Sequence, residues 1–299
     1  MIKYIVISFV FITQLAFCTD SLQVSDIGSS ARMISMGNIE GFSQSSNAIF
    51  ENPAALHSIQ KNAFSSFGTR IFDEAKYANF SYSWRSKWGN WALGHMFVYV
   101  DGIAQTDISN DQFIPVSYFG YRNSLSKLAF QRALSNRLFL GTSLNYTRIS
   151  LDDITGNGIN ADLGFKYYYQ NWSVSVLGKN LIRPLKINYS EGKNEHFPLQ
   201  LLLGSAYNWR DVTLYTQVKK RSSHQYLLKA AAVSYTPVWM PVVSLNGGLK
   251  EYDAINQNYT TASFGMGLTI DTWSFHYAYE KSDHPNFNNF NYFSISWLN

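Results

Sequence analysis

Apolar and polar residues alternate with a period of two along most of the chain after residue 61. In one segment, Phe80, Tyr82 and Trp84 alternate with serine and arginine. The same pattern recurs in the segments 136–150, 259–270 and 273–281. Successive side chains of a β-strand point to opposite faces of the sheet. Each segment is therefore predicted to be a strand with one apolar face and one small or polar face.

About fourteen such segments follow one another. They are predicted at 62–70, 76–86, 90–101, 124–134, 136–150, 156–169, 172–182, 197–208, 211–220, 225–236, 241–251, 259–270, 273–281 and 290–298. Tight turns are expected at 135–136, 170–171 and 271–272, and longer connections at 102–123, 183–196 and 281–289. Short turns that alternate with longer loops are typical of membrane β-barrels, and strands of about ten residues are long enough to cross a bilayer at a tilt.

A β-sandwich is the alternative interpretation, because alternation alone fits both folds. Three observations favour the barrel. Many segments end in aromatic residues, as an interfacial girdle requires. The opposite faces carry Ser, Thr, Asn, Gln and Gly instead of a second hydrophobic layer, and the chain begins with an export signal. We therefore predict an all-β fold, a transmembrane antiparallel β-barrel of about fourteen strands over residues 62–299, although many outer-membrane barrels end on an aromatic residue and this chain ends on Asn299.

The first eighteen residues have the pattern of a signal peptide. Lys3 precedes an apolar run, and Ala16 and Cys18 occupy the −3 and −1 positions of a cleavage site after Cys18. The alternative is a lipoprotein acylated at Cys18, but Phe17 is a poor fit because the residue before a lipid-modified cysteine is normally small. No later stretch is long and apolar enough for a membrane-spanning helix. We expect a protein exported by a cleaved signal peptide, residues 1–18, to the bacterial outer membrane.

Residues 19–61 lack the alternation of the strands. Asn52-Pro53 marks a turn, and Pro53 is suited to the first position of a short helix that continues through Leu56. Irregular backbone at membrane depth is tolerated where it is buried in protein. The segment 19–61 is therefore predicted to be a plug inside the barrel.

Several short motifs follow a fixed order along the chain. The N-terminal motif residues are Ala31, Arg32, Met36, Gly37, Asn47, Asn52, Pro53, Ala54 and Leu56. Downstream motifs lie at 134–141, 162–165, 178–181, 198–207 and 277–279. Together they resemble the PorV/PorQ family within the FadL-like outer-membrane barrels. The resemblance implies a 14-stranded barrel with an N-terminal plug, which agrees with the count from periodicity.

The resemblance implies a non-enzymatic barrel and two alternative functions. PorV-like members serve the type IX secretion system of Bacteroidota-like bacteria, so the partners would be secretion-system proteins or cargo destined for surface attachment. FadL proper takes up long-chain fatty acids, and the alternative is a FadL-like uptake channel for small hydrophobic molecules. That alternative predicts an apolar pocket between Asn47–Leu56 and the barrel wall. Outer-membrane lipid is a partner in both cases.

The amino-acid composition excludes several classes of protein. Aromatic residues make up 16% of the 299 residues and charged residues 15%, with a net charge of +4 and a single cysteine. High aromatic content argues against disorder, one cysteine excludes an internal disulfide, and the small net charge argues against nucleic-acid binding. Alternation explains why the mean hydropathy is only −0.16, since each strand averages an apolar row with a polar one.

Candidate chemistry is sparse. The six histidines do not have metal-ligand spacing, His276 among serines is the coincidence expected in a serine-rich chain, and we expect no catalytic site, metal or cofactor. Asp152-Asp153 is expected to be a solvated hairpin tip, with a cation-binding turn as the alternative. Lys219-Lys220-Arg221 is expected to meet lipid headgroups or solvent. The candidate lumen charges either pair with each other and the plug or line a polar passage; they are Arg85, Arg137, Asp162, Lys166 and Lys229.

Overall fold

A computed structural model describes residues 24–71, 75–109, 112–223, 226–254, 257–282 and 290–299. The predicted signal peptide lies outside the described residues, as does the start of the predicted plug. The described chain forms a sheet of sixteen strands, of which fourteen, all except β8 and β9, close into an antiparallel barrel. Closure is achieved because β1 pairs with both β2 and β16, with Ala63 opposite Ser83 on one side and Leu298 on the other. The predicted all-β fold, an antiparallel barrel of about fourteen strands, is confirmed.

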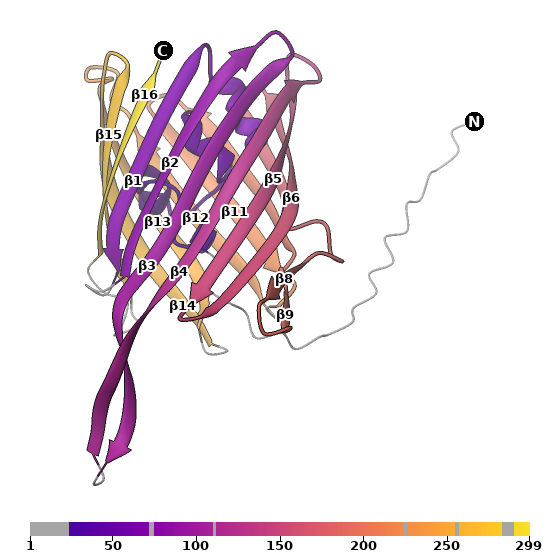
Figure 1. Ribbon diagram of the computed structural model, residues 1–299. Helices are drawn as coiled ribbons and strands as arrows, with labels where there is room; N and C mark the ends of the chain where they lie inside the picture. Colours follow the sequence, from indigo (N-terminus) through magenta and orange to yellow (C-terminus); the bar gives the residue numbers. More distant parts are fainter. Residues whose placement is uncertain (1–23, 72–74, 110–111, 224–225, 255–256, 283–289) are drawn as a thin grey trace.

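The barrel strands run in sequence order around the wall (Figure 1). Their bounds are β1 (Asn62–Ile71), β2 (Ala75–Ser86), β3 (Gly89–Ser109), β4 (Gln112–Ala133), β5 (Leu138–Leu151), β6 (Ile154–Tyr169), β7 (Trp172–Lys179), β10 (Gln200–Trp209), β11 (Val212–Arg221), β12 (Leu227–Tyr235), β13 (Val243–Ala254), β14 (Gln257–Ile270), β15 (Trp273–Ser282) and β16 (Phe290–Leu298). Two-residue turns that connect β6 to β7, β10 to β11 and β14 to β15 contain Gln170, Arg210 and Asp271 with positive φ, as tight hairpins require.

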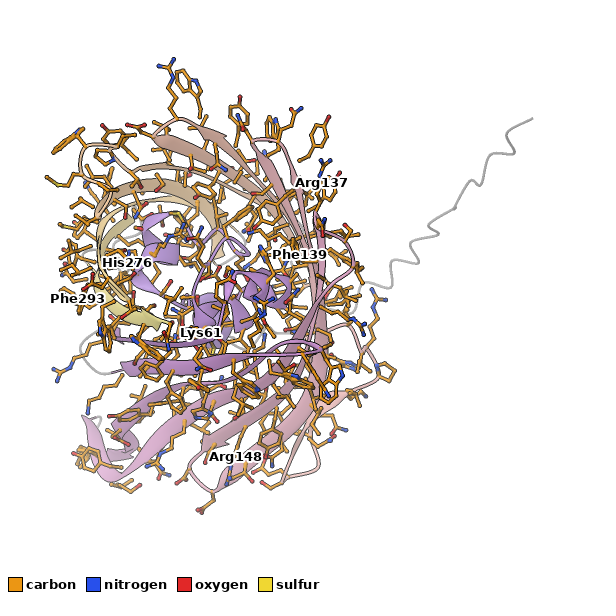
Figure 2. All side chains as sticks on the ribbon, turned by 90° about the horizontal axis from the view of Figure 1, so that it is seen from above. Lys61, Arg137, Phe139, Arg148, His276 and Phe293 are labelled. Atoms are coloured by element: carbon orange, nitrogen blue, oxygen red, sulfur yellow. The ribbon has the colours of Figure 1, made fainter. Side chains whose placement is uncertain are left out.

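The wall has its apolar face outside. Along β6, exposed or half-exposed residues alternate with buried ones, and the buried row includes Asn160, Asp162 and Lys166. The outward row of the strands carries large apolar side chains such as Leu144 and Phe264, whose exposed fractions are 54% and 60%. Figure 2 shows the same division between His276 on the inner side of the wall and Phe293 on the outer side. Apolar side chains face outward and polar ones inward, the arrangement of a membrane barrel.

Two predicted connections contain strands instead. The expected loop 102–123 belongs to β3 and β4, which continue as a paired ribbon beyond the end of the barrel (Figure 1). The prediction was wrong because a ribbon that leaves the barrel has no buried face, so Ile114, Val116 and Tyr118 are all exposed and the ribbon carries no inner polar row. The connection 183–196 likewise contains a small hairpin, β8 (Lys186–Tyr189) and β9 (Asn194–His196), which pairs with β6.

The N-terminal segment lies inside the barrel (Figures 1 and 2). Its helical elements are η1 (Val24–Asp26), α1 (Ala31–Ser35), η2 (Ser46–Ile49) and η3 (Pro53–Ser58). Ser30 caps α1 through a bond from the Met33 amide, and Asn52 caps η3 through a bond from the Ala54 amide. α1 contacts β13 to β16, η2 contacts β1 to β4, and η3 contacts β3 to β6. Within the described ranges, no helix is both long and apolar enough to cross a bilayer.

Candidate functional site inside the barrel

An apolar cluster joins the inner segment to one side of the wall. Ile49, Phe50 and Leu56 from η2, its C-cap and η3 pack with Phe67 of β1 and Met96 of β3, and all five are buried. At Gly94, the ring of Phe50 lies so near the strand that an added methyl carbon would be 2.6 Å from the ring. The interface where the sequence predicts an apolar pocket is therefore apolar, but side chains fill it.

A second contact is formed by backbone against backbone. Gly141 of β5 and Gly164 of β6 are directly opposite each other and face the turn that leads into η3. A methyl carbon at Gly141 would lie 2.7 Å from the Ala54 Cα, and one at Gly164 would lie 2.7 Å from the Asn52 Cγ. Glycine at both positions leaves room for the motif Asn52-Pro53-Ala54 to rest on the wall.

Asn52 fixes this turn to two strands. Its Nδ2 donates to the carbonyls of Phe165 (3.2 Å) and Val176 (3.1 Å) and to Ser175 Oγ (2.9 Å). Its Oδ1 accepts from the Ala54 amide at 2.9 Å. One buried amide side chain thus caps η3 and binds β6 and β7 at the same time. This position needs an asparagine because an amide side chain can both accept and donate hydrogen bonds.

The remaining motif residues contact the wall or other parts of the inner segment. The Ala31 amide donates to Ser294 Oγ (3.2 Å), and Arg32 donates from Nη1 to the Phe42 carbonyl (3.2 Å). Met36 packs in a small apolar cluster with Phe42 and Tyr215. Three further contacts complete the set: Gly37 donates from its amide to Ser263 Oγ, Asn47 accepts from Ser81 Oγ, and Leu56 accepts from Asn90 Nδ2.

Charged residues dominate the side of the segment opposite the apolar cluster. Glu40 forms ion pairs with Lys179 of β7 and with Lys219 of β11, the latter at 3.1 Å. Asp26 pairs with Arg221 at 2.5 Å. Within the wall, Lys127 Nζ lies 2.6 Å from Asp162 Oδ2, and both side chains are only 2% exposed. The pairs of Glu40 and Asp26 link the segment to β7 and β11, and the Lys127–Asp162 pair links β4 to β6 within the wall.

The carboxyl groups of the inner segment differ in the direction in which their surroundings shift the pKa. Burial by itself raises the pKa of Glu40, but Lys179 and Lys219 outweigh it and hold the pKa below its usual value. Burial also raises the pKa of Asp26, but the charges of Arg221 and Lys219 outweigh burial and hold this pKa below its usual value. Glu51 has weaker compensation, so burial raises its pKa. It accepts bonds from the Gly41 and Ser43 amides and from Ser29 Oγ, and it therefore ties together turns of the segment itself.

The candidate lumen charges occupy three different environments. Asp162 and Lys166 lie inside the barrel, where Lys166 Nζ donates to the Gly41 carbonyl at 2.6 Å. Arg85 and Arg137 are exposed at the rim of the barrel at its short-turn end, where Arg85 contacts Gln60 and Arg137 belongs to the turn between β4 and β5. Lys229 lies on the outward face, so its assignment to the lumen was wrong. A charge is tolerated there because it lies two residues from the strand end, where a long side chain reaches water.

The structure also places the basic run 219–221 and the turn Asp152-Asp153. The basic run 219–221 does not lie on the lipid side as a unit, since Lys219 and Arg221 point inward to Glu40 and Asp26. Asp152-Asp153 forms the exposed turn between β5 and β6, with Asp152 at a φ of 51°. No cluster of three or more potential metal ligands occurs in the part of the chain that the structure describes.

Residues that sequence reasoning missed are Glu40, Lys127 and Lys179, whereas Lys219 was singled out but expected to meet lipid or solvent. Lys127 shares the inward row of β4 with Asn123 and Gln131. Its place in that row was therefore open to the same alternation argument. Glu40 had no such signal, because it lies in irregular backbone and its partners are far away in the sequence.

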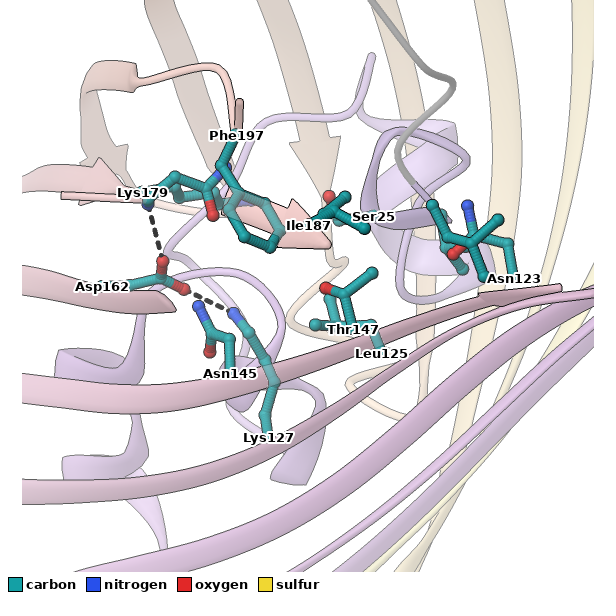
Figure 3. A pocket seen from close by; sticks show the side chains of 13 residues that line it. Ser25, Asn123, Leu125, Lys127, Asn145, Thr147, Asp162, Lys179, Ile187 and Phe197 are labelled. Carbon is teal, nitrogen blue, oxygen red and sulfur yellow. Dashed lines mark hydrogen bonds and ion pairs between the residues drawn. The ribbon is translucent and has the colours of Figure 1, made fainter. Parts of the chain in front are cut away.

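A small pocket lies between the polar side of the interior and the end of the barrel with the longer connections (Figure 3). Lys127 and Asp162 line it together with Leu125, Ile187 and Phe197. Its volume is about 40 Å³, against roughly 150 Å³ for an apolar cavity that holds benzene. The pocket is of a size for water and not for an aromatic hydrocarbon.

Neither the known protein families nor the curated proteins include a match to this chain. Solved structures do match. The CymD monoaromatic hydrocarbon channel superposes with a TM-score of 0.67 at 13% identity, covering 91% of this chain and 98% of that one. The Pseudomonas putida toluene transporter TodX gives 0.61 at 12% identity, covering 90% and 96%. A Pseudomonas aeruginosa FadL homologue gives 0.59 at 11% identity, covering 90% and 97%.

These structures are described as channels and transporters, not as enzymes. At such low identity the likeness concerns the fold and does not extend to assignment within the PorV/PorQ group. The chain therefore has the fold of the FadL-like barrels.

Proposed function

We propose that this protein is an outer-membrane channel for small hydrophobic molecules, with the inner segment 24–61 as its plug. The observation that carries the proposal is the apolar interface between that segment and β1 to β3 inside a barrel with an apolar outer wall. Likeness to hydrocarbon channels supports the same class of solute. The comparisons lend no support to type IX secretion, which we therefore do not put forward.

The two sides of the plug differ in the free energy that is needed to separate them from the barrel wall. Pulling Glu40 from Lys179 and Lys219 would leave buried charges without partners, at a cost of about 3–5 kcal/mol for a broken pair. Separating Phe50 and Ile49 from Met96 and Phe67 exposes apolar surface, which a hydrophobic solute covers again, and breaks neutral hydrogen bonds such as Ser46 to Ser65 instead of ion pairs. The route for an apolar solute is therefore along the β1 to β3 side, while the ion pairs keep the plug in the barrel.

Passage requires that the plug move, because the apolar interface is filled by side chains. A displacement of η2 and Phe50 away from β1 and β3 would open a space lined by Phe67 and Met96. The polar side then acts as a hinge rather than as part of the route.

Uptake by whole cells tests the proposal. Cells that lack their own FadL-type channel are given the gene or an empty vector, and entry of radiolabelled toluene and of a radiolabelled long-chain fatty acid is measured. We expect several-fold faster entry of at least one probe with the gene. Assembly is checked by heat-modifiable migration of the membrane-extracted protein. An assembled barrel that gives no gain over the vector for either probe would overturn the proposal.

A further inference from the structure

Three cations gather on the outward face of β2 to β5, near the end of the barrel that carries the longer connections. They are Lys76 on β2, Arg122 on β4 and Arg148 on β5, and all three are exposed. Their neighbours in sequence Tyr77, Asn123 and Ile149 are buried inside. Since side chains alternate along a strand, the three cations point away from the lumen.

Strand register brings these cations together. Lys76 is opposite Tyr99, Tyr99 is opposite Arg122, and Arg122 is opposite Ser150, so one row crosses four strands. In the adjacent row Phe97 is opposite Ser124, and Ser124 is opposite Arg148. Lys76 Nζ lies over the ring of Tyr99, 5.1 Å from its centroid. Side chains directly opposite on one face of a sheet are close neighbours.

Arg122 and Arg148 line an open hollow of about 530 Å³, of which Lys76 is not a lining residue. Its lining includes both arginines, the rings of Phe97 and Tyr99, and the hydroxyls of Ser124 and Ser150. Asp101 is the acidic residue of the lining. Among the described residues, Lys76, Arg122 and Arg148 form no ion pair, in contrast to the inward-facing Lys127, Lys179 and Lys219, whose charges carboxylates neutralise.

The outer wall becomes apolar beside Lys76, Arg122 and Arg148. Along the same strands toward the short-turn end, the outward residues are large and apolar: Phe80, Leu93, Leu128 and Leu144. An amphiphile whose acyl chains lie on this wall would have its headgroup at the level of the cations. Because membrane barrels have their longer loops outside the cell, that level is the outer leaflet.

We propose that Lys76, Arg122 and Arg148 form a binding site for the phosphorylated headgroup of an outer-leaflet glycolipid. Arginine offers paired donors that match phosphate oxygens, and a lysine adds a point charge. Serine and tyrosine hydroxyls in the hollow supply further donors. This inference rests on the membrane placement in the proposed function and adds a specific lipid partner to it.

The test measures binding of bisphosphorylated lipid A to the purified barrel in detergent by native mass spectrometry. The triple variant Lys76→Gln/Arg122→Gln/Arg148→Gln is compared with Arg132→Gln/Arg137→Gln/Lys229→Gln, which removes three exposed cations elsewhere. We expect affinity to fall at least about tenfold in the first variant and to change little in the second. Dephosphorylated lipid A should bind the unmodified protein no better than bisphosphorylated lipid A binds the triple variant.

Three results would overturn the inference: equal losses in both variants, no preference for the phosphorylated lipid, or displacement of the lipid by millimolar inorganic phosphate, which would assign the site to a free anion. Heat-modifiable migration and toluene uptake of the unmodified protein are measured in parallel. If these fail, the proposed function fails; if they succeed while the triple variant binds lipid A normally, only the lipid site is wrong.

Discussion

Three lysines of the barrel wall donate to backbone carbonyls of the inner segment. Lys166 Nζ reaches the Gly41 carbonyl at 2.6 Å, and Lys127 and Lys179 reach the carbonyls of Ile49 and Phe50 at 3.4 Å. Backbone carbonyls in irregular segments need such donors because no sheet or helix supplies them. The lysines therefore satisfy backbone carbonyls of the inner segment and position it through their charges.

Removing one member of the Lys127–Asp162 pair should be costly. In Asp162→Asn, Lys127 keeps its buried charge but loses its carboxylate, and we expect the free energy of unfolding to fall by about 3–5 kcal/mol. Urea unfolding followed by tryptophan fluorescence measures this. The control is Lys193→Ala, whose partner Glu191 lies 3.7 Å away on the exposed surface, with an expected change of about 0–1 kcal/mol. Equal effects of the two substitutions would contradict the buried network.

His57 of η3 should make the protein's stability sensitive to acid. It stacks on Phe139 with ring centroids 4.1 Å apart, and burial lowers its pKa from 6.5 to about 4. The unfolded state therefore takes up a proton before the folded state does, and this residue's contribution to stability is lost as the pH falls from about 6.5 to about 4. Glu51 acts in the opposite sense, since burial raises its pKa.

The measurement is the melting temperature between pH 7 and pH 4 for the unmodified protein and for His57→Gln. We expect the variant to lose less stability on acidification. An unchanged pH profile in His57→Gln would show that this histidine is not the responsible group.

Alternation predicts which side of the wall a residue faces, and it does so well in the middle of strands. Asp162 and Lys166 lie inside the barrel as expected from the inward row of β6. Lys229 shares the outward row with Ala231 and Val233, although it was predicted to lie on the lumen face. Charge is a poor guide at strand ends, because long side chains there reach water from either face.

The ribbon at the tips of β3 and β4 is separate from the barrel in its contacts. Register shifts occur between Val100 and Ile103 and between Gln105 and Thr106, and Gly102 adopts a φ of 75°. Such irregularities bend a strand pair and end its continuity with the wall.

We expect the ribbon to be dispensable for the barrel. Replacing residues 103–119 by a short Asn-Gly turn should leave heat-modifiable migration intact and shift the melting temperature by no more than a few degrees. Loss of the folded band would mean that the ribbon stabilises the wall. The matched control replaces a wall hairpin of similar length, 140–156, which should abolish folding.

All fourteen wall strands were predictable because each is a local pattern. The fold of the inner segment was not, since its contacts join residues far apart in sequence, such as Ala31 to Ser294 and Asn52 to Ser175. The motif Asn52-Pro53-Ala54 was visible in the sequence. The paired glycines at 141 and 164 that receive it became meaningful only once β5 and β6 were placed against it.

At the scale of the whole molecule, the outer wall determines where the protein resides. Leu144 lies midway along β5 and points outward. In a bilayer, Leu144→Arg should lower the free energy of unfolding by about 2–4 kcal/mol, whereas Ile270→Arg, at the end of the outward row of β14, should lower it by about 0–1 kcal/mol. Folding into lipid vesicles in urea measures both. Equal costs at the two positions would contradict a membrane-embedded wall.

Passage of hydrophobic solutes between the proposed plug and β1 to β3 requires the plug to move. Ser46 of η2 and Ser65 of β1 lie across that interface with their Oγ atoms 2.8 Å apart. Cysteines at these two positions are thus placed to form a disulfide, and the sequence has a single natural cysteine, Cys18, in the predicted signal peptide.

Toluene uptake by cells expressing Ser46→Cys/Ser65→Cys is the most direct measurement, with each single substitution as a control. We expect that oxidation reduces uptake to the level of the empty vector, that reduction restores it, and that the single variants respond to neither. Undiminished uptake with the disulfide formed would contradict passage along this interface.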